Sequence, residues 1–458
     1  MFCYSMYLGT RGLTIPKEMM TPAQQTEFKK RLTFSPKTMG GYTDLSKFYA
    51  YRESPHTLYG PRFYGNHTLS SRLPEGVSID IPFKGSLRDE QQRAIDCFMK
   101  TKCGLLELPC GFGKTILALH LVHLLQRRTL VIVHKEFLLE QWIERIHEFL
   151  PTATIGRIQG DTIDIEKDIV IGMLQSISMK DYPTATFRSF GFTIIDETHH
   201  IAAEVFSNAL FKIVTPYMVG LSATMERKDG LSKVFKLFLG DIVYSASREK
   251  TQVFIHKVTY TTPDVEFNEV ITNFKGDTNY TSMIKRISEF GPRTEALLHL
   301  ITLLKSDPTT KQIMILAHTK YLLKYLHDAI ESRGIATVGY YVGGMKNTDL
   351  KETETKEIIV ATYAMAEEAL DIKTLSTLIL ATPKTDVTQA VGRILRVKHE
   401  KPVVMDLVDP HATFVNQWKK RRTYYMSQGY TILESRHDTY PRMTEYKKKE
   451  SKCLLKIE

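Results

Sequence analysis

Short apolar segments alternate with amphipathic helical stretches along most of this chain. One series occupies residues 87–221 and a second begins at Arg293. Short buried strands separated by helices are typical of βαβ units, in which parallel strands form one sheet between layers of helices. Two series in tandem therefore predict the α/β class, with two domains built on parallel sheets. The expected strands are Gly104–Leu108, Thr129–Val133, Asp168–Gly172, Phe192–Ile195, Met218–Leu221, Gln312–Ala317, Ala336–Tyr341, Glu357–Ala361, Ser376–Ala381 and Val403–Asp406.

The composition changes outside these two series. The N-terminal segment is rich in Tyr, Pro, Gly and Thr and contains one candidate helix, Pro22–Leu32. At roughly 100–200 residues per domain, a chain of 458 residues with 43% hydrophobic side chains can form several domains. We therefore expect a small N-terminal domain (1–85), a first α/β domain (86–245), a connector (246–292), a second α/β domain (293–415) and a basic C-terminal extension (416–458).

Charge and cysteine content limit the environment and the partners. The chain has 61 Lys and Arg against 51 Asp and Glu, and this net charge of +10 favours a polyanionic partner. No apolar run approaches the roughly 18 residues of a membrane span, and the N-terminal residues lack the features of a secretory signal. The five cysteines are scattered and form no zinc-binding pairs. We expect an intracellular protein of a reducing compartment, without a membrane partner.

The first predicted strand is followed by a glycine-bearing loop and a helix. Gly111 and Gly113 let backbone N–H groups curl around a phosphate at the N-terminal end of that helix. The ammonium of Lys114 can then reach the β- and γ-phosphates of a nucleotide, and the Thr115 hydroxyl is placed to bind Mg²⁺. The strand before the loop and the apolar helix after it are the context that such a loop requires. The sequence therefore predicts an ATP and Mg²⁺ site.

Two adjacent acids, Asp196 and Glu197, end the apolar segment Phe192–Ile195. Ligands of open α/β sheets bind at the carboxyl ends of the strands, so both acids are expected beside the phosphate loop. We expect Asp196 to hold Mg²⁺ through water, and Glu197 to orient and deprotonate the attacking water. We interpret His199 as a coupling residue that senses the γ-phosphate, rather than as a metal ligand.

Taken in order, these motifs resemble those of superfamily 2 helicases and translocases. Asp196–His199 matches the DExH form of that family, and Ser222–Thr224 matches the third motif, whose Ser222 and Thr224 couple ATP hydrolysis to movement. The resemblance covers about residues 86–410. It implies two tandem RecA-like domains that bind ATP in the cleft between them.

Further motifs extend the resemblance into the second series. The segment Gln389–Arg396 matches the sixth motif, Q-x-x-G-R-x-x-R. By this likeness Gln389 is a coupling residue, Arg393 and Arg396 are catalytic, and Arg396 is the arginine finger. The likeness also makes Arg88 and Gln91 adenine-site residues and Asp371 a ribose ligand. The positions that match nucleic-acid-contacting motifs are Lys135, Gln175, Ser176, Thr319, Lys320 and Thr362.

Within superfamily 2 the likeness is to the XPB-like and UvsW-like branch, and above all to helicases of nucleocytoplasmic large DNA viruses, including the poxvirus transcript-release type. The segments Gly220–Gly230 and Thr377–Arg396 carry it. It departs from the family at Ala369, where glycine is favoured, and at Lys228, where the XPB branch has glutamate. A viral origin would place the protein in the cytoplasmic virus factory of the host and in the virion.

Three functions follow as alternatives. The first is an ATP-driven monomeric translocase that separates or remodels DNA, in viral transcription or in repair and recombination with the corresponding machinery. The second is a remodeller of RNA or RNA–DNA hybrids, and the third is a nucleic-acid-binding scaffold with weakened ATPase. The C-terminal Lys and Arg either grip nucleic acid or belong to a helix that packs Trp418 and Tyr425 on its own domain.

Overall fold

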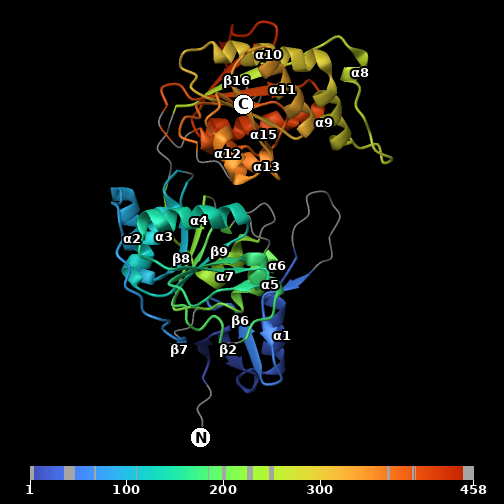
Figure 1. Ribbon diagram of the computed structural model, residues 1–458. Coiled ribbons are helices and arrows are strands. Elements are labelled where there is room, and N and C mark those ends of the chain that lie inside the picture. The colour runs from blue at the N-terminus through green and yellow to red at the C-terminus, as the bar shows by residue number, and fades with distance from the viewer. Residues whose placement is uncertain are drawn as a thin grey trace, which may run out of the picture. The chain divides into compact units, whose positions relative to one another are not determined.

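The computed structural model divides the chain into two compact units, Met1–Ser247 (unit 1) and Arg248–Glu458 (unit 2). Figure 1 shows both units with their helices and strands labelled. Among the described residues, no helix combines the length and the apolar character needed to cross a membrane. The structure describes residues 5–35, 47–65, 69–109, 111–183, 185–198, 203–223, 231–246, 252–368, 372–394, 397 and 399–446.

A twisted sheet forms the centre of unit 1. Within the described residues it has eight strands, and only the edge strand β11 runs antiparallel to its neighbour. The apolar segments predicted as strands in this half are confirmed, with ends that shift by one residue or less. The strands in spatial order are β11 (Thr162–Ile163), β10 (Ile155–Gln159), β12 (Ile169–Met173), β9 (Thr129–Val133), β13 (Phe192–Ile195), β14 (Tyr217–Ser222), β8 (Cys103–Glu107) and β15 (Ile242–Ser245).

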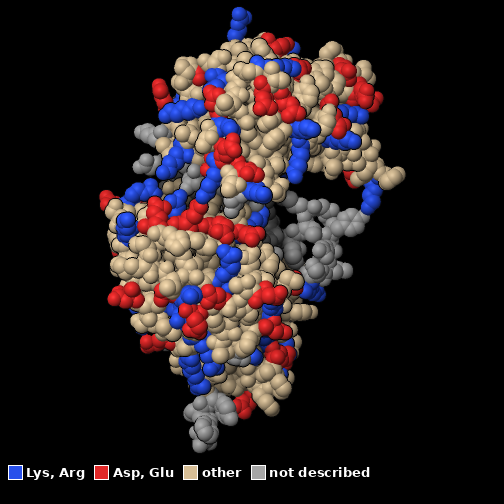
Figure 2. Space-filling view, in the orientation of Figure 1, with Lys and Arg blue, Asp and Glu red and all other residues tan. Residues whose placement is uncertain are grey.

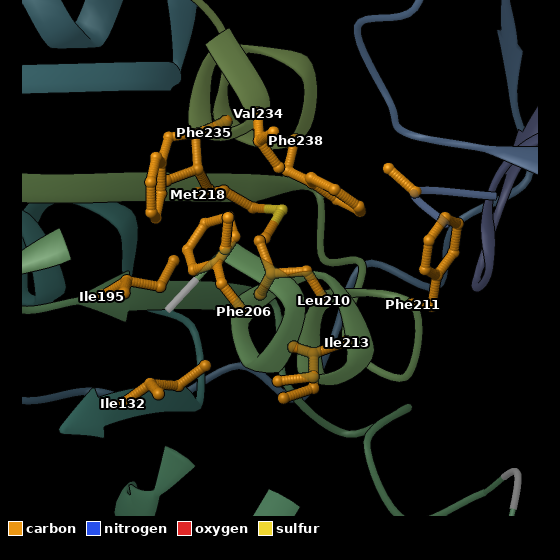
Figure 3. Packing of buried hydrophobic residues seen from close by; sticks show 14 of the residues in the cluster. Ile132, Ile195, Phe206, Leu210, Phe211, Ile213, Met218, Val234, Phe235 and Phe238 are labelled. Atoms are coloured by element: carbon orange, nitrogen blue, oxygen red, sulfur yellow. The ribbon is translucent and has the colours of Figure 1, made fainter. Parts of the chain in front are cut away.

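Two helical layers cover this sheet. Successive strand residues point to opposite faces, so Leu105 and Leu106 enter two different apolar clusters. Figure 3 shows one cluster, in which Phe206 of α6 and Phe235 of α7 approach Met218 of β14. The helices on that face are α5 (Leu174–Met179), α6 (Ala203–Leu210) and α7 (Ser232–Leu239), and those on the other are α2 (Asp89–Thr101), α3 (Lys114–Leu125) and α4 (Glu136–Phe149).

The N-terminal residues form a small sheet that shares a core with unit 1. Its inward side chains Leu13, Ile15 and Leu58 belong to the same apolar cluster as α6 and α7. Gly12 has φ of 90°, and a Cβ there would lie 2.3 Å from the Gly60 carbonyl oxygen, so this turn requires glycine. The elements are β1 (Tyr7–Gly9), β2 (Gly12–Pro16), a 3₁₀ turn (Lys17–Met19), α1 (Pro22–Arg31), β3 (Thr33–Phe34), β4 (Phe48–Tyr49), β5 (Arg52–Glu53), β6 (Thr57–Gly60) and β7 (Ser70–Ser71).

Unit 2 repeats the architecture. Its sheet has eight strands among the described residues, and only β23 is antiparallel to its neighbour. The strands in spatial order are β18 (Val338–Tyr341), β19 (Ile358–Thr362), β17 (Ile313–Ala317), β20 (Thr377–Leu380), β21 (Val403–Val408), β16 (Phe254–Thr259), β22 (Thr431–Arg436) and β23 (Thr444–Glu445). The helices are α8 (Val265–Asn268), α9 (Tyr280–Glu289), α10 (Gly291–Lys305), α11 (Lys320–Ser332), α12 (Asn347–Thr353), α13 (Tyr363–Glu368), α14 (Thr388–Arg393) and α15 (Ala412–Ser427). The α/β class is confirmed in both units.

The structure differs from the expected boundaries at two places in unit 2. The expected connector contains β16, which pairs with β21 and β22 inside the sheet. The polar residues His256 and Lys257 interrupt its apolar pattern, and in the fold the buried Nδ1 of His256 lies 3.0 Å from the Tyr440 hydroxyl. The expected C-terminal extension contains most of α15 and the strands β22 and β23 of the sheet. Trp418 and Tyr425 are buried on their own unit, as one of the two interpretations of this segment expected.

Candidate active site

The glycine-bearing loop follows β8 and begins α3. Gly113 has φ of 86°, a left-handed conformation that favours glycine, and it directly precedes the first residue of α3. A Cβ on Gly113 would lie 2.5 Å from the side-chain nitrogen of Gln91. The N–H groups of the first turn of α3 have no partner within the helix itself. Such a helix terminus attracts anions, because its N–H groups and its dipole both favour negative charge.

The two expected adenine-site residues contact this loop. Gln91 Nε2 donates to the Phe112 carbonyl oxygen at 2.9 Å, and the Arg88 guanidinium donates to the same oxygen. The Arg88 backbone N–H in turn donates to Gln91 Oε1 at 2.9 Å. The start of α2 is therefore joined to the phosphate loop through hydrogen bonds, and Gln91 is buried at 3% exposure.

Lys114 and Glu197 form an ion pair across the edge of the sheet. Lys114 Nζ lies 2.9 Å from Glu197 Oε1. Strand β14 separates β8 from β13, so the two residues are brought together by the loops that follow nonadjacent strands. Glu197 has φ of 48°, a conformation that is costly for a residue other than glycine. This turn after β13 directs the carboxylate toward the phosphate loop.

Asp196, which directly follows β13, is buried at 6% exposure. Its Oδ2 accepts a 2.9 Å hydrogen bond from the indole N–H of Trp142, and its Oδ1 accepts one of 2.9 Å from the Glu197 backbone N–H. Burial and the neighbouring Glu197 carboxylate raise the pKa of Asp196 to about 6, although Lys114 and the two hydrogen bonds oppose the shift. The site therefore holds a carboxylate that a nearby cation would stabilise.

The donor set at this edge fits Mg²⁺ bound together with a nucleotide. Among the described residues there is no cluster of three or more His, Cys, Asp or Glu that could hold a metal by itself. Mg²⁺ in nucleotide sites commonly uses one or two protein oxygens with water and phosphate oxygens. Thr115, the second residue of α3, and Asp196, after β13, offer a hydroxyl and a carboxylate at the same sheet edge. Burial and the Glu197 carboxylate raise the pKa of Asp196 despite the nearby Lys114, so a further cation at this edge would favour the ionised carboxylate.

Comparison with known proteins identifies the family. Residues 84–227 match the family described as "Type III restriction enzyme, res subunit". The chain is 33% identical over 443 residues to L396 of Acanthamoeba polyphaga mimivirus, named as an inferred ATP-dependent RNA helicase, covering 92% of this chain and 85% of that protein. The chain belongs to the superfamily 2 helicases.

Two further comparisons agree with this family. The helicase is 27% identical over 370 residues to the inferred helicase D10 of Escherichia phage T5, covering 78% of each chain. The solved structure of S. cerevisiae Dbp5 bound to RNA and ADP BeF3 superimposes with a TM-score of 0.54, over 77% of this chain and 90% of that one. Because those two sequences are only 14% identical, this likeness shows the fold alone, which is a tandem of RecA-like domains.

The helicase places Ser222 between the phosphate loop and the two acids. Ser222 pairs in register with Glu107 of β8, and its carbonyl oxygen accepts a 2.8 Å hydrogen bond from the Leu108 N–H. On the other side Gly220 pairs with Ile195, next to Asp196. The expected coupling residue Ser222 therefore lies within the candidate site of unit 1. His199 and Thr224 lie outside the described residues.

The unit 2 residues of the expected site are described in part. Gln389 lies in α14 of the helicase, whose last residue is Arg393. Asp371, Arg396 and the side chain of Arg393 lie outside what the structure describes.

The expected nucleic-acid contacts form one group in each unit. In unit 1, Lys135 follows β9, Gln175 and Ser176 follow the neighbouring β12, and Gln175 Nε2 donates to the His134 carbonyl oxygen at 3.1 Å. In unit 2, Ala317 of β17 pairs with Thr362 of β19. Thr319 and Lys320 follow β17 at that same edge, where the Thr319 hydroxyl caps α11. Each group lies at the carboxyl ends of parallel strands.

One functional neighbour was not found from the sequence. Trp142 is buried in the core at 1% exposure, and its indole N–H binds Asp196. The amphipathic pattern of α4 predicts that Trp142 is buried. Because a buried tryptophan N–H nearly always has a hydrogen-bond partner, this burial predicts a partner for the indole N–H. The identity of that partner depends on tertiary structure and has no signal in the sequence.

Proposed function

We propose that this helicase uses ATP hydrolysis to move along a DNA strand and to separate or remodel duplexes. The observation that carries the proposal is the ion pair of Lys114 with Glu197 beside buried Asp196, at the N-terminus of α3. This arrangement joins a phosphate-binding cation and a basic carboxylate at one sheet edge. The membership in superfamily 2 supports an ATP-dependent motor over a nucleic-acid-binding scaffold.

The ion pair suggests how nucleotide binding prepares the site for hydrolysis. In our proposal the phosphates of ATP attract the Lys114 ammonium away from Glu197, so that the Glu197 carboxylate becomes available as a base. Water then attacks the γ-phosphorus, the bond from that phosphorus to the bridging oxygen breaks, and Glu197 accepts the proton of the water. Mg²⁺ bound by Thr115 and Asp196 would neutralise charge on the phosphates.

The second unit supplies the remaining groups in this proposal. Arg393 and Arg396 would contact the nucleotide across the cleft between the units, with Arg396 as the arginine finger, and Asp371 would bind the ribose. Gln389 and the third motif would then couple nucleotide hydrolysis to movement of the residues that contact nucleic acid. Arg396→Ala should lower the turnover by about 10³-fold or more, with a smaller change in ATP affinity.

The charge distribution of unit 1 supports a defined path for the strand. Helix α4 carries glutamates at every fourth position, and Figure 2 shows a row of acidic side chains across it. Glu140 pairs with Arg157 and Glu148 with Arg145, but α4 still carries more acidic than basic residues. Negative charge along α4 repels a polyanion, so the nucleic-acid backbone would pass along the ends of β9 and β12 that carry Lys135 and Gln175 instead. The acidic residues of this row are Glu136, Glu140, Glu144 and Glu148.

Branch and biological role extend the proposal. The likeness of its motifs to the XPB-like and UvsW-like branch, together with relatives from a giant virus and a phage, favours a virus-encoded protein that acts in transcription or in DNA repair and recombination. RNA is the second candidate substrate, because L396 is named as an inferred RNA helicase. An RNA or RNA–DNA substrate would make transcript release the favoured process.

Strand separation tests the substrate directly. Tailed duplexes of DNA, RNA and DNA–RNA hybrid with one shared sequence are mixed with the full chain and ATP, and release of a labelled strand is measured. The proposal predicts release from DNA duplexes, and no release with Glu197→Gln. Release from RNA or hybrid duplexes alone would replace DNA with the second candidate. ATP turnover without release of a strand from any duplex would support movement along nucleic acid but not strand separation. The absence of both ATP turnover and strand release would contradict the proposed motor.

A further inference from the structure

A pocket of about 700 Å³ lies in unit 1, away from the candidate active site. The N-terminal sheet forms most of its wall, and the segment before β13 contributes Arg188. Figure 2 shows Lys and Arg side chains on this end of unit 1, near β2 and β7 of Figure 1. The described residues that line the pocket include three arginines and two tyrosines, and none of them is acidic. Neither the phosphate loop nor the residues expected to contact nucleic acid contribute to this pocket.

The strand register holds the lining residues in place. Tyr7 of β1 pairs with Thr14 of β2, and Thr14 pairs with Tyr59 of β6, so the three side chains lie on one face of the sheet. Gly9 pairs with Gly12, which places Arg11 at the tip of a two-residue hairpin. Arg72 follows β7, and its N–H donates to the Leu8 carbonyl oxygen at 2.8 Å. The pocket is therefore built on regular structure.

Two of the arginines are held by aromatic rings. The guanidinium carbon of Arg72 lies 3.9 Å from the ring centroid of Tyr7, and that of Arg11 lies 5.5 Å from the centroid of Tyr59. A guanidinium over a ring keeps its N–H donors directed outward, so less conformational entropy is lost when they bind an anion. Within the described part of the chain, Arg11, Arg72 and Arg188 form no ion pair. Two of the three cations are thus preorganised, and none of the three is neutralised by a carboxylate of the described residues.

We propose that this pocket binds the sugar–phosphate backbone of a nucleic-acid single strand. The choice of nucleic acid rests on the proposed function, whereas the anionic and planar character of the ligand rests on the pocket itself. Planar guanidinium groups bind phosphate oxygens in a bidentate manner, and tyrosine rings and guanidinium planes both stack on bases. Three cations from three separate segments suit successive phosphates better than one isolated anion. The pocket would then bind the nucleic-acid strand at a place separate from the residues at the carboxyl ends of the β-strands that are expected to contact it during movement.

Binding without nucleotide tests this site separately from the motor. The full chain is titrated into a labelled twenty-nucleotide single strand, as DNA and as RNA, over a range of salt concentrations. The double variant Arg11→Ala/Arg72→Ala should weaken binding about tenfold and reduce the slope of log affinity against log salt by about 1.4, since each lost phosphate contact removes about 0.7. ATP turnover without nucleic acid should stay unchanged.

Two matched variants complete the experiment. Lys30→Ala/Lys84→Ala removes the same charge from exposed residues outside the pocket lining, and should change the affinity less than twofold. Arg11→Lys/Arg72→Lys keeps the charge but removes the planar donors, and should restore the salt slope without restoring the full affinity. Equal binding by the Arg→Ala and Lys→Ala double variants would overturn the proposal. So would binding of AMP or inorganic phosphate as tight as that of the strand.

This design keeps the two proposals distinguishable. If nucleic acid stimulates the ATPase but the Arg→Ala variant binds like the Lys→Ala control, the pocket proposal is wrong and the motor stands. If the strand binds through Arg11 and Arg72 but no nucleic acid stimulates turnover, the pocket stands and the proposed motor function is wrong.

Discussion

The indole N–H of Trp142 donates a 2.9 Å hydrogen bond to Asp196 Oδ2. Trp142 lies in the middle of α4, a helix that begins directly after Lys135 at the strand-contact edge. One rigid helix therefore contacts both the buried acid of the nucleotide site and the loop expected to hold nucleic acid. A displacement of α4 would therefore change both the hydrogen bond to Asp196 and the position of Lys135. This contact gives a physical basis for communication between the nucleotide site and the residues of unit 1 that are expected to contact nucleic acid.

Replacing Trp142 by phenylalanine should separate its packing from its hydrogen bond. The variant keeps most of the apolar volume but leaves an oxygen of Asp196 without its donor, so the pKa of Asp196 should rise further. We expect the acid limb of the pH–turnover profile to move to higher pH, and the free energy of unfolding to fall by about 1–3 kcal/mol. The other tryptophan of the chain provides a control. Trp418→Phe, also buried, should cost stability without moving the acid limb.

The pH dependence of turnover should itself respond to Mg²⁺. Asp196 ordinarily ionises near 3.8, and in this site its pKa is raised to about 6 by burial and by Glu197. The carboxylate form binds the metal and the protonated form does not, so at limiting Mg²⁺ turnover should fall as the pH drops through about 6. A tenfold increase in Mg²⁺ should lower this midpoint by up to about one pH unit, because metal and proton compete. A midpoint insensitive to Mg²⁺ would argue against Asp196 as a ligand.

The two partners of the ion pair should fail in different ways. Glu197→Gln removes the proposed base and should lower ATP turnover by about 10²–10⁴-fold while ATP still binds. Lys114→Ala removes the phosphate-binding cation and should weaken ATP binding as well. Turnover and equilibrium binding of a fluorescent ATP analogue measure the two effects. Glu166→Gln, at an exposed acid outside the site, should behave like the parent protein, and equal loss in all three variants would contradict the assignment.

The C-terminal helix makes a stability prediction at Arg421. This residue forms a bidentate pair with Asp406, both contacts being 2.7 Å, and both side chains are buried. Arg421→Ala would leave the Asp406 carboxylate buried without its cation, so the free energy of unfolding should fall by about 3–5 kcal/mol. Chemical denaturation measures this loss. Lys420→Ala, at the exposed neighbouring position, should change stability by less than about 0.5 kcal/mol, and an equal loss at both positions would refute the structural role of Arg421.

The sequence predicted the strands that consist mostly of apolar residues. Segments such as Phe192–Ile195 and Ile313–Ala317 are buried on both faces of a parallel sheet, so their pattern is continuous and easy to recognise. Strand β16 was not predicted, because His256 and Lys257 interrupt its apolar pattern, and their partners Tyr440 and Glu434 lie far away in the sequence. The N-terminal sheet escaped prediction for a related reason. Its strands are short and have one covered face, which gives little periodicity.

The candidate site was predicted as far as local sequence determines position. Lys114 and Glu197 each follow a predicted strand of one sheet, and parallel strands present their carboxyl ends at one edge, so their meeting could be expected. The raised pKa of Asp196 and its bond to Trp142 could not, since both depend on how α4 packs against β13. The basic pocket around Arg72 was missed because its arginines come from separate segments and meet only in the folded sheet.

The most direct test of the account is ATP turnover by the full chain, with and without single-stranded and duplex DNA and RNA. The account predicts that turnover rises severalfold with nucleic acid, that DNA is an effective stimulant, and that Glu197→Gln abolishes both the basal and the stimulated rate. A steady ATP turnover that no nucleic acid changes would contradict the central claim that this site drives movement on a strand.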